Sequence, residues 1–332
     1  MADDDQKPGT LRARAGIAPR GPKDRAGSPL PPRAPKRPGK PRPDAADAPA
    51  RSLARPGIST SARLSPALNV VVGAVRKAGR GLLKDFGEVQ NLQASVKGPG
   101  DFVSEADRKA EDLLRAELLR ARPAFGFLGE EGGGSGTKDW EYRWVVDPLD
   151  GTTNFLHGIP HWAISVGIEK RLTDTTTEVV AGVIYNPAAD EMFWAEKGAG
   201  AYLNDRRIRV SARRSMLEAL FATGIPFAKV QRKAEFSATL SALMPQVAGI
   251  RRFGSAALDL AWVAAGRYDG FWELGLNRWD IAAGLILVKE AGGVLSDPDG
   301  ADPYLNGHVV AANPHLFAPL RDAVRQGMAT AR

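Results

Sequence analysis

The residues best suited to chemistry lie in the segment WVVDPLDGTTNF, near the middle of the chain. An apolar run delivers Asp147 at its carboxyl end, the proline that follows disfavours a helix there, and Gly151 allows a tight turn. Asp147 and Asp150 therefore project from one bend. With the carbonyl oxygen of Leu149 between them, they offer only hard oxygen ligands, which suit Mg²⁺ or Mn²⁺ better than a soft metal.

Asp-Pro and Asp-Gly are also ordinary turn dipeptides, so the interpretation depends on further carboxylates. Glu130 and Glu131 end a second predicted strand, and Asp280 opens a predicted helix after a turn. Taken singly, each of these acids could be a solvated loop residue or a helix cap. Gathering acidic groups from three element ends is costly unless cations neutralise them, which favours a metal site.

Paired hard cations would suit the hydrolysis of a phosphate monoester. The substrate is a dianion and its transition state spreads charge over the phosphoryl oxygens, so cations and backbone N–H groups at a helix start stabilise it. Metal binding also acidifies an attacking water, and a carboxylate linked through a threonine hydroxyl can align that water and accept its proton. Such an in-line reaction needs no covalent enzyme intermediate.

Other hydrolytic and metal chemistries fit the sequence poorly. The D-x-D-G-T signature of the haloacid dehalogenase class separates its aspartates by one residue, whereas two residues separate Asp147 from Asp150. No phosphate-binding P-loop or serine-hydrolase elbow is present. His157 and His161 are four residues apart, but a glycine and a proline between them break any helix that would make them a zinc pair.

The elements that position the acidic residues can be predicted from hydrophobic spacing. A long amphipathic helix begins at Ser65, and a second helix, capped by Ser104 after a glycine-rich loop at 98–100, carries Asp107 in its first turn. The glycine run 132–136 is expected to be a loop tip. Short apolar runs predict strands of a largely meandering sheet at 125–128, 142–146, 163–169, 179–185 and 192–195.

The last third of the chain alternates between helices and short strands, as in a layered α/β structure. Helices are predicted near 232–244, 256–265, 280–290 and 314–325, with short strands near residues 219, 251, 270, 294 and 309. We therefore divide the chain into a tail at 1–62, an N-terminal α+β half at 63–213 and a C-terminal α/β half at 214–332.

The first 60 residues differ from the rest of the chain. They hold 12 of the 24 prolines, 13 Lys or Arg, 6 Asp or Glu and no aromatic residue, which is typical of a disordered basic tail. The formal net charge of +7 belongs to this tail, because the residues after it carry 32 basic and 32 acidic side chains. A basic segment without aromatic residues can attract phosphates but cannot read bases.

Composition also bears on the compartment. The chain has no cysteine, which excludes disulfides and thiolate metal sites and fits a reducing compartment. Its longest uncharged stretches are shorter than the roughly 20 residues that a membrane-spanning helix needs. The acidic amino terminus does not resemble a secretory signal. We therefore expect a cytoplasmic protein without a membrane span.

The motifs GEE, DPLDGTTNF and WD, in this order, resemble those of the inositol monophosphatase family of metal-dependent, lithium-sensitive phosphatases. The resemblance extends over residues 65–328, and the block 254–273 resembles bacterial members, including the SuhB-like group. It implies a homodimer with the layered α/β/α/β/α sandwich of the sugar phosphatase superfamily, to which fructose-1,6-bisphosphatase also belongs.

The resemblance also implies which residues would hold metal. A first Mg²⁺ would be held by Glu130, Asp147 and the Leu149 carbonyl. A second Mg²⁺ would be held by Asp147, Asp150 and Asp280, so that Asp147 bridges the two ions.

Catalytic and substrate-binding roles follow from the same resemblance. Asp107 and Thr152 match the pair that orients the attacking water, and Glu130 joins them in the catalytic group. The amides of Gly151 and Thr152 match a phosphate-binding turn. The residues that match substrate-binding positions are Gly151, Thr152, Asp150, Gly254, Ala256 and Glu273. Asn277 departs from the animal enzymes, where a histidine is common.

The expected activity is Mg²⁺-dependent hydrolysis of myo-inositol 1-phosphate, or of a similar small polyol phosphate, to the alcohol and phosphate. Hydrolysis of histidinol phosphate, fructose 1,6-bisphosphate or a nucleotide 3'-phosphate would use the same metal core, and these alternatives stay open. An alternative of another class is a SuhB-like partner of RNA or the transcription machinery. The basic tail would add weak nucleic-acid contact to such a role.

Overall fold

The computed structural model describes residues 64–92, 99–227 and 232–331. The predicted tail at 1–62 and Gly98 of the predicted glycine-rich loop lie outside the described residues. Contacts divide the chain after Ile58, and everything described below belongs to the unit that begins at Ser59. Within the described ranges, no helix is both long and apolar enough to cross a membrane.

Two long helices precede the first sheet, α1 (Pro66–Leu92) and α2 (Pro99–Ala121). Ser65 caps α1 as predicted, since its hydroxyl accepts a hydrogen bond from the Leu68 amide at 3.3 Å. The predicted cap at Ser104 is wrong, because α2 begins at Pro99 and carries Asp107 in its third turn instead of its first. A proline suits a helix start, where its missing N–H costs nothing, and this explains the earlier beginning.

Eight strands form the first sheet, in the order β2-β1-β3-β4-β5-β6-β7-β8. All neighbours run antiparallel except β1 and β3, which run parallel, so the predicted meander is largely confirmed. The strands are β1 (Gly126–Gly129), β2 (Gly133–Gly136), β3 (Tyr142–Asp150), β4 (Ala163–Arg171), β5 (Thr177–Asn186), β6 (Glu191–Glu196), β7 (Gly200–Leu203) and β8 (Arg206–Ile208).

Strand β2 corrects the loop predicted for the glycine run 132–136. Gly133 pairs with Gly129 and Gly136 with Gly126, so the run closes an antiparallel hairpin with β1. Pairing of this kind uses only backbone groups, and a run of glycine and serine has no apolar alternation by which a strand is recognised.

The second sheet has the order β10-β9-β11-β13-β12 and follows β8 in the chain. Helices occur near all four positions predicted for this part. The strands are β9 (Leu220–Thr223), β10 (Gly249–Arg251), β11 (Gly270–Leu274), β12 (Val294–Ser296) and β13 (His308–Ala312). The helices are η1 (Met216–Glu218), α4 (Lys233–Leu243), η3 (Met244–Gln246), α5 (Ala256–Ala264), α6 (Arg278–Glu290), α7 (Pro303–Asn306) and α8 (Phe317–Thr330), and the short α3 (Thr152–Leu156) follows β3.

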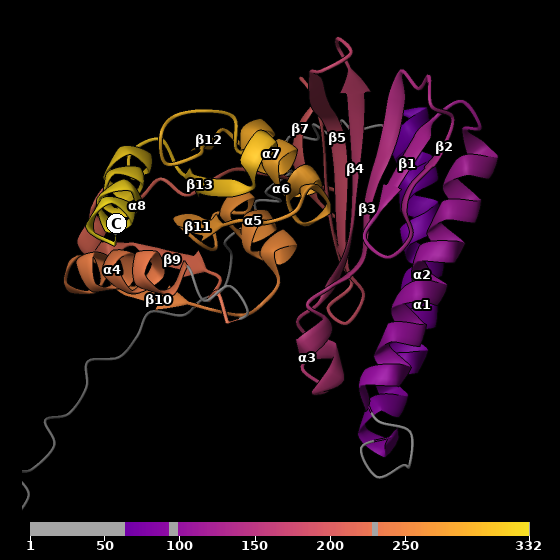
Figure 1. The fold of residues 1–332 in the computed structure, drawn as a ribbon, viewed down its shortest axis with the longest axis horizontal. Helices are drawn as coiled ribbons and strands as arrows, with labels where there is room; N and C mark the ends of the chain where they lie inside the picture. Colours follow the sequence, from indigo (N-terminus) through magenta and orange to yellow (C-terminus); the bar gives the residue numbers. More distant parts are fainter. Residues whose placement is uncertain (1–63, 93–98, 228–231, 332) are drawn as a thin grey trace, which may run out of the picture. The chain divides into compact units, whose positions relative to one another are not determined.

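The elements stack in five layers (Figure 1). Helices α1 and α2 cover one face of the first sheet, where α1 packs on β5 and α2 on β3. Helix α6 packs on the other face, on β4, β5 and β6, and α5 lies beside it against β9, β11 and β13. Helices α4 and α8 cover the far face of the second sheet. The layered α/β/α/β/α sandwich is therefore confirmed.

Three apolar cores fill the four interfaces between the layers. One core includes Trp144, Phe155 and Trp162 beneath α1 and α2, and another surrounds α5 and α6 between the two sheets. A third, smaller core lies beneath α4 and α8 and includes Phe221 and Trp272. Burial of these large side chains supplies the main stabilisation of the layers.

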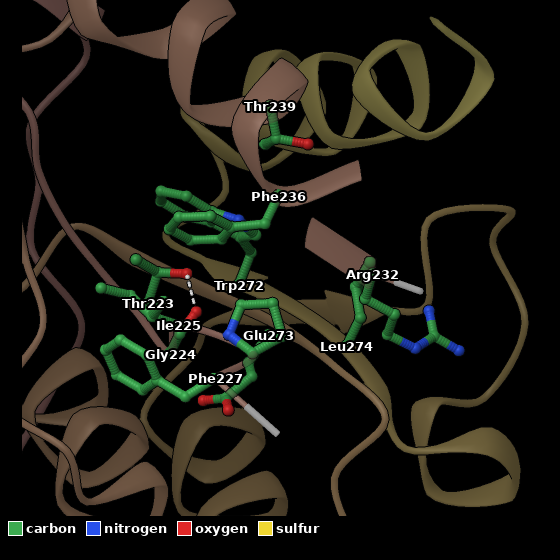
Figure 2. A pocket seen from close by; sticks show the side chains of 11 residues that line it. Thr223, Gly224, Ile225, Phe227, Arg232, Phe236, Thr239, Trp272, Glu273 and Leu274 are labelled. Carbon is green, nitrogen blue, oxygen red and sulfur yellow. Dashed lines mark hydrogen bonds between the residues drawn. The ribbon is translucent and has the colours of Figure 1, made fainter. Parts of the chain in front are cut away.

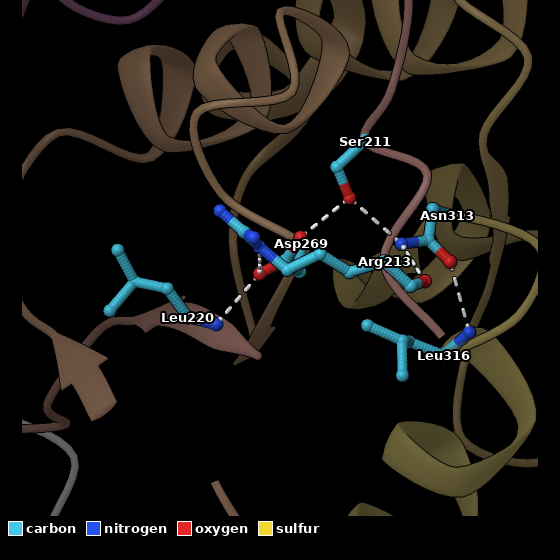
Figure 3. Close-up of polar contacts among 6 residues, drawn as sticks. All are labelled: Ser211, Arg213, Leu220, Asp269, Asn313 and Leu316. Atoms are coloured by element: carbon cyan, nitrogen blue, oxygen red, sulfur yellow. Dashed lines mark hydrogen bonds and ion pairs between the residues drawn. The ribbon is translucent and has the colours of Figure 1, made fainter. Parts of the chain in front are cut away.

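A buried aspartate ties the segment between the two sheets to the second sheet (Figure 3). Asp269 accepts hydrogen bonds from the Ser211 hydroxyl at 2.5 Å, the Arg213 guanidinium at 3.1 Å and the Leu220 amide at 2.8 Å. Asn313 joins this cluster by donating to Ser211 at 2.9 Å. The carboxylate thus holds the chain where it passes from β8 to β9.

Candidate active site

The paired aspartates lie at the end of β3, where the strand is irregular. The register between β3 and β4 shifts between Asp147 and Asp150, which breaks the ordinary alternation of side chains. Asp147 is buried, with 2% of its surface exposed, and accepts a hydrogen bond from the Leu149 amide at 2.9 Å. Strand and bend together hold both carboxylates at one edge of the first sheet.

The parallel pairing of β1 with β3 brings the predicted glutamate to the same edge. Gly129 pairs with Val146, so the next residue on each strand, Glu130 and Asp147, are neighbours. The Glu130 charge is accordingly among the causes that raise the pKa of Asp147. Sequence spacing alone does not reveal this proximity, because it depends on the pairing of two strands.

Asp150 connects the first sheet to α5. Its Oδ2 accepts hydrogen bonds from the Ser255 hydroxyl at 2.5 Å and from the Ala257 amide at 2.7 Å. Ser255 is also the N-cap of α5, since its hydroxyl accepts from the Leu258 amide at 3.3 Å. The positive end of that helix therefore faces Asp150.

The turn after Asp150 requires a glycine. Gly151 has a φ of 96°, and a Cβ there would lie 3.0 Å from the His161 carbonyl oxygen. Helix α3 starts directly after it. The Thr152 hydroxyl donates to the Leu149 carbonyl at 3.0 Å, so the predicted water-orienting group and the predicted metal-binding carbonyl are bonded to each other here.

Asp107 and Asp280 approach from helices. Asp107 is 4% exposed on α2, and its Oδ1 has no hydrogen-bond partner among the described residues. Asp280 lies in the first turn of α6, where its Oδ2 accepts from the Asn277 amide at 2.7 Å in a capping box. The helix-cap alternative considered for Asp280 is thus realised as well.

Glu111, which the sequence analysis missed, supports the turn that carries Glu130. It is 2% exposed, one helical turn beyond Asp107, and accepts from the amides of Glu131 and Gly132, each at 2.8 Å. Arg115 pairs with it at 2.5 Å. An acid four residues after Asp107, on the apolar face of the helix, is the signal that could have indicated it.

The acidic groups raise one another's pKa. Burial, followed by the charges of Asp150 and Glu130, raises the pKa of Asp147 well above its usual range. Burial and the Glu130 charge raise the pKa of Asp107 to about 8. Burial is also the main cause that raises the pKa of Asp150 and of Glu130, each to about 7. Full ionisation of the group is therefore costly without a neutralising cation.

The acidic side chains offer the oxygen ligands that a hard cation prefers, although some of them accept hydrogen bonds from protein groups in this structure. In the described part of the chain, no group of three or more His, Asp or Glu side chains is arranged to hold an ion as it stands. Asp150 and Asp280 are instead bonded to protein N–H and O–H groups. All the acids nevertheless offer oxygen ligands of like charge, and the buried Asp107, whose Oδ1 is unpartnered in the described residues, has its pKa raised by the Glu130 charge.

A cavity of about 160 Å³ collects most of the predicted substrate-binding residues. Its lining includes the predicted residues Asp150, Gly254, Ala256, Glu273 and Asp280. Asp107, Glu130, Asp147, Leu149, Gly151 and Thr152 are not among the residues that line it.

Asp259 also lines this cavity and was missed by sequence reasoning. It is 1% exposed on α5, and its Oδ1 has no hydrogen-bond partner in the described ranges. Burial, followed by the charges of Glu273 and Asp150, raises its pKa well above the usual range. An aspartate inside the apolar run of a buried helix was the available signal.

His157 and His161, for which no zinc pair is predicted, have different surroundings. His161 packs edge-on against Trp262 and Phe253, with ring centroids 5.2 and 5.3 Å apart. Burial lowers the pKa of His161 to about 4. His157 is exposed, so the two rings lie in different environments.

Comparison with known proteins covers nearly all of this unit. The sequence profile of the inositol monophosphatase family matches residues 63–328. The inositol-1-monophosphatase of Mesorhizobium japonicum is 55% identical over 79% of this chain and 97% of that protein. The Nus factor SuhB of Pseudomonas aeruginosa is 43% identical over 79% of this chain and 97% of that protein. The native crystal structure of the extragenic suppressor protein suhB from Bartonella henselae has a TM-score of 0.72 and 52% identity, covering 79% of this chain and 100% of that one.

The fold and the acidic site, together with these relatives, define a phosphoric monoester hydrolase. The chain belongs to the inositol monophosphatase family. The resemblance predicted from the motifs GEE, DPLDGTTNF and WD is thereby confirmed.

Proposed function

We propose that this enzyme hydrolyses myo-inositol 1-phosphate, or a similar small polyol phosphate, to the free alcohol and phosphate with the help of Mg²⁺. The observation that carries the proposal is the group of buried carboxyls around Asp147, whose pKa values burial and mutual repulsion raise. Relatives support the substrate: those from Mesorhizobium japonicum and Rhizobium meliloti are named inositol-1-monophosphatase. A Staphylococcal relative, 25% identical with a TM-score of 0.65, was solved with inositol monophosphate bound.

We assign the metal ligands as the family resemblance implies. Glu130, Asp147 and the Leu149 carbonyl would hold one Mg²⁺, and Asp147, Asp150 and Asp280 a second. When bound, the ions would neutralise phosphoryl charge and make a nearby water more acidic. The hydrogen bonds of Asp150 with Ser255 and of Asp280 with Asn277 engage the Oδ2 atom of each carboxyl, and a carboxylate can bind a cation through its other oxygen.

The remaining steps use the chain's own groups. The amides of Gly151 and Thr152, at the start of α3, donate to phosphate oxygens. Asp107 accepts the proton of the attacking water, because its Oδ1 is unpartnered and burial raises its pKa to about 8. The Thr152 hydroxyl orients that water after leaving the Leu149 carbonyl, to which it donates in this structure.

The leaving alcohol lies against the cavity on the α5 side. Gly254 and Ala256 supply a close backbone surface, and Glu273 offers its carboxyl to the alcohol's hydroxyl groups. A polyol has several hydroxyls that can donate to this carboxyl, whereas a plain alkyl phosphate has none. This arrangement favours a polyol over an unsubstituted leaving group.

A kinetic panel at fixed Mg²⁺ tests the proposal. The substrates are myo-inositol 1-phosphate, fructose 1,6-bisphosphate, histidinol phosphate and a nucleotide 3'-phosphate. We expect the highest kcat/KM for the inositol ester, no turnover after metal stripping in EDTA, and inhibition by Li⁺. Full turnover in excess EDTA would refute the metal assignment. A higher kcat/KM for another ester would identify that ester, and not the inositol ester, as the preferred substrate.

A second function is supported by other relatives. The Nus factors SuhB of Pseudomonas aeruginosa and Escherichia coli are 43% and 41% identical to this chain, and the tail at 1–60 is basic. We propose weak contact with RNA or the transcription machinery as this second function, in a cytoplasmic homodimer. Light scattering of the purified protein tests the dimer, and binding of an unstructured RNA at rising salt tests the contact.

A further inference from the structure

A second, apolar cavity lies beside the acidic site. It measures about 220 Å³ and lies between the end of β9, helix α4 and strand β11 (Figure 2). Two residues, Gly224 and Glu273, line both this cavity and the one that holds the predicted substrate-binding residues. The two spaces are therefore neighbours across a shared wall.

That wall is thin. A Cβ placed on Gly224 would lie 2.1 Å from the carboxyl atoms of Glu273, so the Glu273 side chain rests directly on the glycine backbone. A little further along, Arg252, which lines the acidic cavity, places its guanidinium 5.2 Å from the ring centroid of Phe227, which lines the apolar one. The Glu273 side chain, from β11, and the backbone of Gly224, directly after β9, form the wall between the two cavities here.

The chemistry of the apolar cavity differs from that of a polyol site. Phe236, Trp272 and Leu274 give it aromatic and aliphatic walls (Figure 2). Its hydroxyls are already engaged, since Thr223 donates to the Gly224 carbonyl at 3.2 Å and Thr239 to the Glu235 carbonyl at 2.8 Å.

Arg232, which with Glu273 is one of the two charged residues on the lining, is engaged as well. The Arg232 guanidinium lies 3.1 Å from Glu235 Oε2 and 3.1 Å from His308 Nε2. Apart from Glu273, which also lines the acidic cavity, the side chains of this lining give the hydroxyls of a sugar ring little to replace the water that they would lose. A flat apolar ring loses little by comparison.

We propose that this cavity receives the aromatic ring of a second substrate class, phosphate monoesters of alcohols that carry one flat apolar ring. This inference rests on the proposed function, because the phosphate would occupy the same carboxylate site. Small-molecule pockets usually measure about 300–1,000 Å³. The acidic and apolar cavities, about 160 and 220 Å³, reach that range only together. A compact polyol phosphate fills the first, and an aryl-alkyl phosphate extends into the second.

The reaction itself is unchanged. Water adds to phosphorus, the bond between phosphorus and the ester oxygen breaks, and the alcohol leaves with a proton while inorganic phosphate is released. The ring contributes binding energy and takes no part in the bond changes, so its effect appears in kcat/KM for ring-bearing esters only.

The test compares 2-phenylethyl phosphate with ethyl phosphate, which lacks the ring, and with myo-inositol 1-phosphate. Ile225→Trp fills the cavity from the segment after β9, and Phe236→Ala removes one aromatic wall. Leu217→Trp, at a position that is 72% exposed and outside the lining, is the matched control. Thermal melts of all the variants verify folding.

We expect the wild type to favour 2-phenylethyl phosphate over ethyl phosphate by about tenfold or more in kcat/KM, the scale of a small apolar pocket. Both cavity variants should remove most of this preference and change turnover of the inositol ester by less than about twofold. Leu217→Trp should change neither the preference for the phenylethyl ester nor turnover of the inositol ester.

The outcomes separate the inference from the function on which it rests. Equal turnover of the phenylethyl and ethyl esters, with normal hydrolysis of the inositol ester, overturns the ring cavity and leaves the proposed function standing. Loss of all three activities in the cavity variants shows a structural role and also overturns the ring cavity. No hydrolysis of any ester by the wild type overturns both.

Discussion

Asp147 and Asp269 are equally buried, each 2% exposed, yet their surroundings are opposite. Asp269 accepts from a serine hydroxyl, a guanidinium and a backbone amide (Figure 3). Asp147 accepts from one backbone amide and is otherwise surrounded by the acids Asp150, Glu130 and Asp280. Protein donors therefore satisfy the Asp269 carboxylate, whereas the Asp147 carboxylate has mainly other acids around it.

The difference separates a carboxylate that stabilises the fold from one that serves a ligand. A buried charge costs free energy unless partners neutralise it, and folding alone gives no reason to gather four acids at one edge of a sheet. The acids around Asp147 therefore lower the stability of the metal-free protein. The cluster around Asp269 adds stability at the passage from β8 to β9 and has no need of a ligand.

The largest expected effect is on turnover at Asp147. Asp147→Asn should lower kcat by about a thousandfold or more, beyond the roughly 10- to 100-fold typical of residues that only support a metal ligand. The metal-free variant should melt at the same temperature as the wild type or higher, because one of four repelling charges is gone. Phosphate release and a melt in EDTA measure the two halves, with Asp174→Asn, in an exposed loop, as control. Near-normal turnover would show that Asp147 shapes the turn and is not needed for the reaction.

Asp269→Ala should give the opposite result. The substitution leaves the Leu220 amide and the Ser211 hydroxyl without their acceptor, so we expect the free energy of unfolding to fall by about 2–3 kcal/mol. The folded fraction should keep its kcat, since the cluster is not part of the acidic site. Urea unfolding followed by an assay at low temperature measures both. A variant as stable as the wild type would contradict the anchoring role.

Much of the fold around Asp147 could be predicted from the sequence, because the signals for it are local. The turn at Gly151, the cap at Ser65 and the strands beside Asp147 follow from short patterns, and family motifs supplied the layered fold. Glu111 and Asp259 each had a local signal, an acid on an apolar helix face, but the groups that surround them come partly from other elements, so their roles could not be predicted. The bond from Ser255 to Asp150 likewise joins residues 105 positions apart.

Two predictions about the fold were wrong: the start of α2 and the loop at 132–136. The start of α2 was placed at Ser104 because a serine is a strong capping signal, yet Pro99 begins the helix earlier. Strand β2 was missed because its glycines pair through backbone groups alone. Neither feature is encoded in hydrophobic spacing: the first depends on where a proline is tolerated, and the second on backbone pairing.

Stability of the metal-free protein should depend on pH through the acidic site. The pKa values of Asp107 and Asp150 are raised in the folded state, to about 8 and about 7, from an unfolded value of 3.8. Their contribution to stability is therefore complete below about pH 4 and is lost as pH rises through 7 to 8. We expect the melting temperature in EDTA to fall between pH 5 and pH 8, and Mg²⁺ to reverse the fall. A rise over that range would contradict the repulsion.

Thr152→Ala should have a smaller effect. We expect turnover to fall by about tenfold, within the range of a lost proton-transfer partner or water-positioning group, with little change in Mg²⁺ affinity. Thr153→Ala, the exposed neighbour, serves as control. If the variant instead loses Mg²⁺ affinity and recovers full rate at high Mg²⁺, the hydroxyl supports the Leu149 carbonyl, as its 3.0 Å hydrogen bond would then explain.

Deletion of residues 1–60 should have the smallest effect on the enzyme. The family match begins at residue 63, and the tail supplies no member of the acidic site. We expect kcat and melting temperature to stay unchanged, while any binding of RNA at low salt is lost. RNA binding that is equal with and without the tail would move that contact onto residues 61–332.

The central claim is that Mg²⁺ completes the group of acids around Asp147, and calorimetric titration of metal-stripped protein tests it most directly. We predict saturable Mg²⁺ binding to the wild type and to Asp269→Asn, with loss of most of the binding heat in Asp147→Asn. Absence of Mg²⁺ binding to the wild type, or binding of equal affinity in Asp147→Asn, would contradict the account.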